Sequence, residues 1–135
     1  MIGIVIISHG NLGVALSESA EMIFGEKNDI VNVSISSISE NAEVFRDQIV
    51  AAIDSADRGN GVVVLTDLFG GTPCNLAISI AGTRNIEIVA GVNLPMVLKL
   101  LSIRAQNKAP ALKELAEFAK DSGKKQISVV SDFMV

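Results

Sequence analysis

The only histidine of the chain, His9, comes one residue after an apolar run near the amino terminus, residues 2–7. A histidine can act as a base, a metal ligand or a phosphoryl acceptor. A second reactive residue, Asp67, follows another apolar run, residues 62–66. A carboxylate that binds one imidazole N–H fixes the ring tautomer and leaves the other nitrogen as a nucleophile. We therefore predict His9 and Asp67 as a catalytic pair. A structural histidine and an ordinary loop carboxylate stay open as alternatives.

A glycine follows His9, and two glycines and a threonine follow Asp67 within a few residues. Each of these two loops leads into a predicted helix. Free N–H groups at a helix N-terminus suit a phosphoryl group, and glycine lets the backbone approach it closely. The same glycines and threonine are also compatible with an ordinary turn before a helix. The predicted phosphoryl-binding residues are Gly10, Gly70, Gly71 and Thr72.

Apolar residues near these loops could form a docking surface for a partner protein. Phe69 is either folded inward or exposed, and the side chains of residues 94 and 96 are also compatible with packing on a helix face. A third loop, residues 91–95, is predicted to reach the same edge of the sheet. The predicted docking residues are Leu68, Phe69, Asn93, Leu94 and Met96.

Several other site chemistries do not fit the sequence. Neither the phosphate-binding G-x-x-x-x-G-K-[ST] loop nor the G-x-S-x-G nucleophile elbow occurs, and no G-x-G-x-x-G follows the first apolar run. One His and one Cys would make an unusual zinc site, and Ser8 and His9 stand where a response-regulator receiver needs acidic residues. We predict no metal and no cofactor. A small-molecule-binding domain that uses His9 as a hydrogen-bonding residue stays open.

Apolar spacing predicts alternating strands and helices along the whole chain. The predicted strands are the first apolar run and residues 30–35, 62–66, 86–90 and 126–131. The first four strands, each followed by a helix, predict an α/β fold with an open, doubly wound sheet of four parallel strands and helices on both faces. The carboxyl edge of such a sheet is where ligands collect. The sequence contains no linker or repeat, so we predict a single domain over residues 1–135.

Helix boundaries and buried faces follow from capping residues and periodicity. Gly25 is a predicted helix stop, and the predicted N-caps are Ser39 or Asn41, Thr72 and Asn93, the last for a helix over 95–104. The predicted buried stripes are Leu12, Leu16, Ala20, Ile23 and Phe24 in the first helix, Phe45, Ile49, Ala52 and Ile53 in the second, and Leu112, Leu115, Phe118 and Ala119 in the last.

Composition narrows the class of protein further. Hydrophobic residues make up 49% of the 135 residues, which favours a folded aliphatic core, and the net charge of −4 argues against nucleic acid as a partner. No apolar run is long enough for membrane insertion. The single cysteine, Cys74, is expected to be a packing residue in a reducing compartment. We predict a cytoplasmic protein.

Three blocks of the sequence resemble the IIA component of the mannose family in the phosphoenolpyruvate-dependent sugar phosphotransferase system. They are residues 6–10 (IISHG), 66–75 (TDLFGGTPCN) and 90–96 (AGVNLPM), and the resemblance covers essentially the whole chain. It implies a phosphotransferase in which His9 accepts a phosphoryl group from phospho-HPr and passes it to a IIB component during sugar uptake. By the same resemblance, Asp67 is the carboxylate beside the histidine and Thr72 the hydroxyl near the phosphoryl group.

The resemblance also implies a homodimer in which a carboxyl-terminal strand, here residues 126–131, crosses to the partner's sheet. A peripheral association with a sugar permease fits the same family. Two family-level alternatives stay open: a regulatory phosphotransfer module without a sugar channel, and the related phosphotransfer subunit of dihydroxyacetone kinase, whose third loop differs from Gly70-Gly71-Thr72-Pro73. Since Val135 closely follows the predicted last strand without a tether, the acceptor is expected to be a separate protein.

Overall fold

The computed structural model describes residues 1–36, 41–108 and 110–134, and its elements follow the predicted alternation. The candidate cap Ser39 lies outside the described residues. In chain order the elements are β1 (Gly3–His9), α1 (Leu12–Phe24), β2 (Val31–Ile35), α2 (Ala42–Ala56), β3 (Val62–Thr66), α3 (Thr72–Ile80), β4 (Ile86–Ala90), α4 (Leu94–Ala105), α5 (Leu112–Lys125) and a short 3₁₀ helix over Val130–Phe133.

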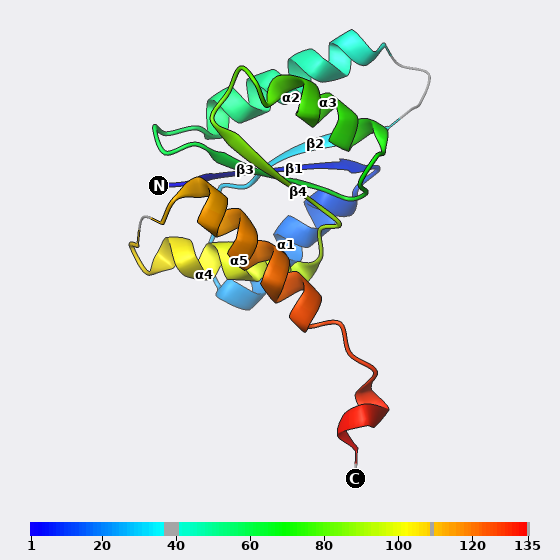
Figure 1. Cartoon of the computed structure of the whole chain (residues 1–135), viewed down its shortest axis with the longest axis vertical. Coiled ribbons are helices and arrows are strands. Elements are labelled where there is room, and N and C mark those ends of the chain that lie inside the picture. The colour runs from blue at the N-terminus through cyan, green and yellow to red at the C-terminus, as the bar shows by residue number, and fades with distance from the viewer. Residues whose placement is uncertain (37–40, 109, 135) are drawn as a thin grey trace.

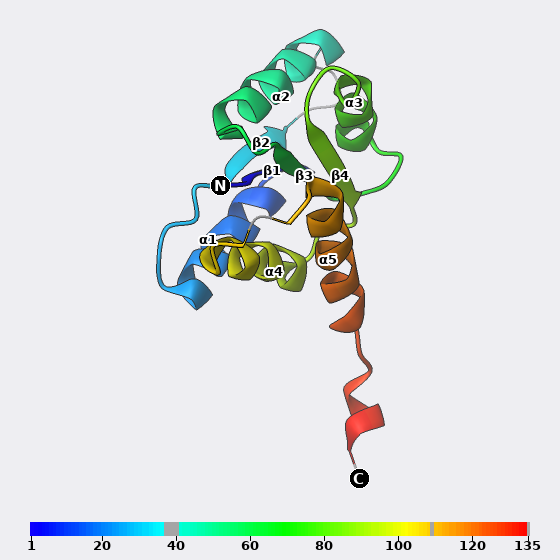
Figure 2. The ribbon, with the colours of Figure 1, turned by 60° about the vertical axis from the view of Figure 1, so that its left-hand side comes forward.

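The sheet has four strands in the order β2-β1-β3-β4, and each neighbouring pair is parallel. Helices cover both faces, with α2 and α3 on one side and α1, α4 and α5 on the other (Figures 1 and 2). This confirms the predicted open, doubly wound α/β fold. In such a sheet the carboxyl ends of all strands lie at one edge and the amino ends at the opposite edge.

The two central strands explain why their sequences read as continuous apolar runs. Residues 62–65 of β3 and residues 4–7 of β1 are at most 1% exposed because each strand is covered on both faces. Side chains of alternating residues contribute to two separate core clusters, one under α1, α4 and α5 and the other under α2 and α3. Cys74 is buried as expected.

Capping residues position most helices as the sequence indicated. Gly25 ends α1 in the left-handed conformation with φ +80°. The side chain of Asn41 accepts a hydrogen bond from the Glu43 amide, and Asn93 accepts one from the Met96 amide. Thr72 is the first helical residue of α3 rather than its N-cap, because Gly71 takes the extended cap conformation. The predicted cap was one residue late.

The buried face of α1 differs from the predicted stripe. Its buried residues are Gly13, Ser17 and Ala20, whereas Leu12 and Ile23 are 45% and 59% exposed. The small residues let α1 lie close to the sheet: a Cβ at Gly13 would come within 2.8 Å of the Asn32 Oδ1 atom. The prediction failed because it assumed that large side chains fill the contact. The α2 stripe is buried as predicted, but Phe118 in the last helix is 40% exposed.

The predicted strand over residues 126–131 is wrong for the single chain. After α5 the chain leaves the body of the molecule and forms the short 3₁₀ helix (Figures 1 and 2). A strand needs a neighbouring strand for its backbone hydrogen bonds, and none of the four described strands pairs with this segment. The apolar alternation that suggested a strand is nevertheless present, with Ile127 and Val129 76% and 65% exposed.

Within residues 1–36, 41–108 and 110–134, no helix combines the length and apolar character needed to span a membrane.

Candidate functional site

The loops after β1, β3 and β4 meet at the carboxyl edge of the sheet. In the strand register Ile7 lies beside Thr66, and Thr66 lies beside Ala90. The Thr66 carbonyl also accepts hydrogen bonds of 2.9 Å from the amides of Gly91 and Val92, which holds the third loop against the second. The predicted convergence of the three loops is therefore confirmed.

His9 and Asp67 are in direct contact at this edge. The Asp67 Oδ2 atom lies 2.8 Å from His9 Nδ1 and accepts a second hydrogen bond, of 2.9 Å, from the His9 backbone N–H. A carboxylate can only accept, so Nδ1 carries the ring proton and the lone pair is on Nε2. The His9 side chain is 49% exposed, and no described residue bonds its Nε2 atom. The ring thus offers a nucleophilic nitrogen to solvent.

The electrostatics keep Asp67 ionised. Burial raises the pKa of this carboxyl, whose side chain is only 9% exposed. The two hydrogen bonds from His9, the attraction to its ring and the nearby amide of Leu68 together outweigh burial and hold the pKa of Asp67 below its ordinary value. A charged carboxylate against Nδ1 stabilises positive charge that develops on the ring when Nε2 forms a bond.

Backbone contacts fix the turn between β1 and α1. The Ser8 hydroxyl is buried and accepts a 2.9 Å hydrogen bond from the Gly13 amide, which ties the start of α1 to the end of β1. Gly10 has φ +56°, a conformation that favours glycine. Its amide donates a 2.9 Å hydrogen bond to the Ile35 carbonyl. Gly10 therefore shapes the turn, and its N–H is not free to bind a phosphoryl group as the sequence suggested.

The start of α3 lies beside the histidine ring. A Cβ at Gly71 would be 3.8 Å from His9 Cε1, and Gly70 adopts φ +80°. The Asn75 side-chain amide donates a 3.2 Å hydrogen bond to the Gly70 carbonyl and so braces the loop, a contact that sequence reasoning missed. Thr72 is exposed at the first position of the helix. The free N–H groups of this first turn and the positive end of the helix dipole favour an anion near His9.

Large apolar side chains that lie close to His9 or Asp67 in the sequence are exposed. Leu68 is 58% exposed and Phe69 is 85% exposed, so Phe69 points outward rather than into the core. Leu12, three residues after His9, adds a third apolar side chain that is 45% exposed. Sequence reasoning assigned Leu12 to the core, because its spacing from Leu16 matches one turn of a helix. Leu12, Leu68 and Phe69 form what we call the apolar rim.

Three other predicted docking residues do not belong to this rim. Met96 is 4% exposed and lies in the core, which makes its side chain inaccessible to a partner. Leu94 is half-buried against the same core cluster. Asn93 uses both ends of its amide within the fold, accepting from the Met96 amide and donating 3.1 Å to the Gly123 carbonyl of α5. It fixes α4 against α5.

The part of the chain that the structure describes contains no group of three or more His, Cys, Asp or Glu side chains that could hold a metal ion.

The fold and the site define an α/β protein with a carboxylate-held histidine at the carboxyl edge of its sheet, and comparison with known proteins gives its family. The EIIA-man family, described as "PTS system fructose IIA component", matches residues 3–117. The chain belongs to this family of phosphotransferase-system (PTS) EIIA components, as the sequence blocks indicated.

Relatives and solved structures agree with this assignment. The chain is 36% identical over 135 residues to the PTS system fructose-specific EIIA component of Bacillus subtilis, covering 99% of this chain and 90% of the relative. It is 32% identical to the mannose-specific EIIAB component of Escherichia coli K12 over 96% of this chain but only 39% of that longer protein.

The crystal structure of phosphotransferase system component EIIA from Streptococcus agalactiae superposes with a TM-score of 0.82 at 27% identity, covering 98% of this chain and 99% of that one. The mannose/sorbose-specific IIA subunit from Enterococcus faecalis gives a TM-score of 0.76 at 29% identity, covering 95% and 93% of the two chains.

Proposed function

We propose that this chain is a phosphohistidine carrier: His9 Nε2 accepts a phosphoryl group from phospho-HPr and passes it to a IIB component in sugar uptake. The single observation that carries the proposal is the 2.8 Å bond between Asp67 Oδ2 and His9 Nδ1. It orients the ring, assigns the proton to Nδ1 and leaves Nε2 free at an exposed edge. Membership of the EIIA family supports the same chemistry.

In the proposed step the Nε2 lone pair attacks the phosphorus atom of the donor phosphohistidine. The P–Nε2 bond forms as the donor's N–P bond breaks, and the electron pair of the broken bond returns to the donor imidazole. His9 keeps its proton on Nδ1 and gains imidazolium character, which the Asp67 carboxylate stabilises. Transfer to the IIB component reverses these roles. Neither step needs a metal ion or an external base.

The start of α3 is suited to hold the transferred group. The backbone of Gly71 lies beside the ring, and the exposed Thr72 hydroxyl can donate to a phosphoryl oxygen. The remaining free N–H groups of the first turn add to this interaction. Gly70 contributes by allowing the loop to reach this position with its positive φ.

The apolar rim is the proposed docking surface for both HPr and the IIB component. Phe69, 85% exposed, is the best candidate for a side chain that enters a pocket of the partner. A carrier that must release each partner after transfer needs a small surface rather than a large permanent interface. Peripheral contact with a sugar permease would then be mediated by the IIB partner. We place the carrier in the cytoplasm, since its free thiol at Cys74 fits a reducing compartment.

The names of the relatives refer to different sugars, namely fructose, mannose and sorbose. This variation is expected if the sugar is selected by another component and if the IIA site sees only phosphohistidine partners. We therefore assign this chain to the transfer of the phosphoryl group and assign it no particular sugar.

We also propose a homodimer built through the carboxyl-terminal segment. Its large apolar residues are 65% to 76% exposed in the single chain: Ile127, Val129, Val130, Phe133 and Met134. Exposure of this many apolar side chains in one segment indicates an interaction site. β4 is an edge strand of the sheet. Pairing of residues 126–131 from a second copy with this edge would cover both the segment and the edge.

The experiment that tests the carrier function uses enzyme I, HPr and phosphoenolpyruvate. We expect the intact mass of the wild-type chain to rise by one phosphoryl group, the adduct to be acid-labile, and His9→Ala to stay unmodified. Addition of a mannose-type IIB should then discharge the phosphorylated protein. An unmodified wild type, or a labelled His9→Ala variant, would contradict the proposal. Phosphorylation without discharge would favour a regulatory module instead.

A further inference from the structure

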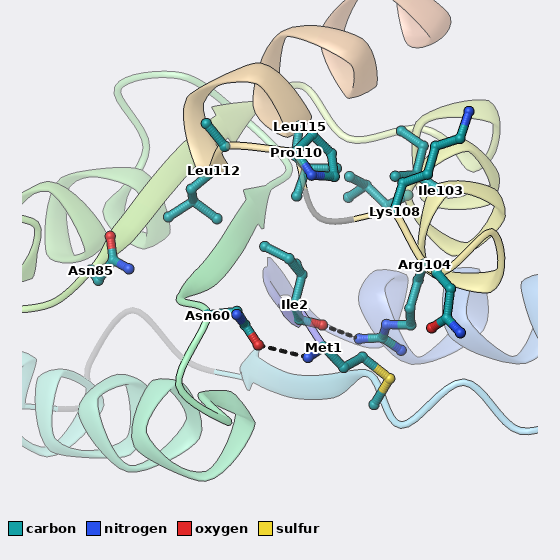
Figure 3. A pocket seen from close by; sticks show the side chains of 13 residues that line it. Met1, Ile2, Asn60, Asn85, Ile103, Arg104, Lys108, Pro110, Leu112 and Leu115 are labelled. Atoms are coloured by element: carbon teal, nitrogen blue, oxygen red, sulfur yellow. Dashed lines mark hydrogen bonds between the residues drawn. The ribbon is translucent and has the colours of Figure 1, made fainter.

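A cavity of about 420 Å³ lies at the amino edge of the sheet, opposite the His9 site. Its lining includes Ile2 directly before β1, Asn60 shortly before β3 and Asn85 directly before β4 (Figure 3). α4 and the start of α5 close its other side. A volume of this size is typical of sites for small molecules, and its position makes it independent of the phosphotransfer chemistry.

Arg104 of α4 carries a half-buried positive charge at this cavity. Its guanidinium donates a 2.7 Å hydrogen bond to the Ile2 carbonyl (Figure 3) and another hydrogen bond to the Asn28 carbonyl. The buried Nε atom has no hydrogen-bond partner among the described residues. No described carboxylate forms a direct ion pair with Arg104, and the Asp29 carboxylate attracts its charge from farther away.

The rest of the polar lining also favours a negatively charged ligand. Lys108 adds a positive charge at the margin of the cavity, with its ammonium pointing away from Arg104 (Figure 3), and Asn60 and Asn85 contribute side-chain amides. None of the described residues that line the cavity is an Asp or a Glu. In a chain with a net charge of −4, a cavity with only positive charges is unusual. Such a lining attracts an anion.

The walls of the cavity are apolar. Leu112 and Leu115 of α5 face Ile103 and Ile2 across it (Figure 3). Two guanidinium nitrogens of Arg104 bind backbone carbonyls, and each keeps a second N–H that a ligand can use. An inorganic phosphate would leave the apolar walls without contacts, whereas a carboxylate with a hydrocarbon body uses both the positive charge and the apolar walls.

We infer that this cavity is a binding site for a small apolar carboxylate, with the carboxylate beside Arg104 and the hydrocarbon body between α4 and α5. Such a ligand would give the Arg104 guanidinium an anionic partner on the cavity side and stabilise the folded chain by mass action. The inference does not depend on the proposed carrier function.

The test is an NMR titration of the ¹⁵N-labelled full chain with 4-phenylbutanoate, its neutral amide and inorganic phosphate. We expect the carboxylate to shift the amide signals of Ile103 and Leu112 in a saturable manner, with a Kd on the order of 1 mM. The neutral amide should bind about tenfold more weakly, because it lacks the charge. The amide signal of Leu68, at the opposite edge, should not move.

Three variants distinguish binding in this cavity from nonspecific effects of charge. Leu112→Trp fills the cavity and should abolish saturable binding, and Lys108→Gln should weaken it about threefold, as expected for an exposed charge. Lys99→Gln, which removes an exposed charge from α4 outside this cavity, should leave the Kd unchanged.

Absence of saturation up to about 20 mM carboxylate, equal affinity for the neutral amide, or unchanged binding in Leu112→Trp would overturn the inference. Saturable binding of inorganic phosphate at the same signals would overturn the assigned ligand class. Phosphorylation of His9 in each variant reports separately on the carrier function.

Discussion

Replacement of Asp67 tests how much the carboxylate contributes to transfer. In the structure its Oδ2 atom binds both the Nδ1–H and the backbone N–H of His9, at 2.8 and 2.9 Å. Asp67→Asn can keep an oxygen in this place but loses the charge. A hydrogen bond to a charged group is worth about 1.5–3 kcal/mol and a neutral one about 0.5–1.5 kcal/mol. The difference of roughly 1–1.5 kcal/mol corresponds to transfer that is about tenfold slower.

Asp67→Ala removes the orientation of the ring as well as the charge. We expect transfer to slow by about 10²–10⁴-fold, the range for a positioned catalytic partner. The fold should be kept, because the His9 side chain is 49% exposed and water can replace the lost hydrogen bonds. The assay is rapid-quench measurement of phosphoryl transfer from phospho-HPr, with intact mass as the readout. Asp54→Asn, which neutralises a carboxylate on α2 that binds Arg84, is the matched control and should transfer at the wild-type rate.

The pH dependence of this bond follows from the pKa of Asp67, which hydrogen bonds from His9 hold below its ordinary value. The stabilisation is present above the unfolded pKa of about 3.9 and is lost as the pH falls through the lower native value. Urea unfolding should therefore show a larger difference in the free energy of unfolding between wild type and Asp67→Asn at pH 6 than near pH 3.

A transfer rate of Asp67→Ala within about twofold of the wild-type rate would refute the role given to the carboxylate.

Three further predictions concern docking, packing and assembly. Phe69→Ala should raise the KM for phospho-HPr several-fold in steady-state transfer while the Tm stays within about 1 °C, since the side chain is 85% exposed. Gly13→Ala should destabilise the fold by about 1–3 kcal/mol in urea unfolding, because its Cβ would lie 2.8 Å from the Asn32 side chain, whereas Gly82→Ala has nothing within 4 Å and should be near neutral. Deletion of residues 125–135 should convert the proposed dimer to monomers or aggregates in light scattering, and a wild-type monomer at micromolar concentration would contradict the proposed assembly.

The sequence predicted the pairing of His9 and Asp67 because this pairing depends mainly on the order of the strands. His9 and Asp67 end two central strands whose apolar runs are unmistakable, and parallel neighbours place such residues side by side. The role of Gly10 was not predictable in this way. Its amide is used by the Ile35 carbonyl of β2, and that contact depends on the register of a third strand.

Tertiary contacts also explain why Asn93 and Met96 were wrongly assigned to the docking surface. Asn93 reaches the Gly123 carbonyl because α5 lies beside the start of α4, a contact between residues thirty positions apart. Met96 is buried by the same packing. The alternation near Ile127 correctly marked an apolar segment, but a strand there requires an edge that the single chain does not supply.

The most direct measurement of the central claim uses the fact that the chain has one histidine. Protein labelled with ¹⁵N only in its histidine ring gives two nitrogen signals, both from His9. Before phosphorylation, we predict the proton on Nδ1, as the bond to Asp67 requires. After incubation with enzyme I, HPr and phosphoenolpyruvate, we predict ³¹P coupling to Nε2 alone. A phosphoryl group on Nδ1, or ring signals that do not change, would contradict the account.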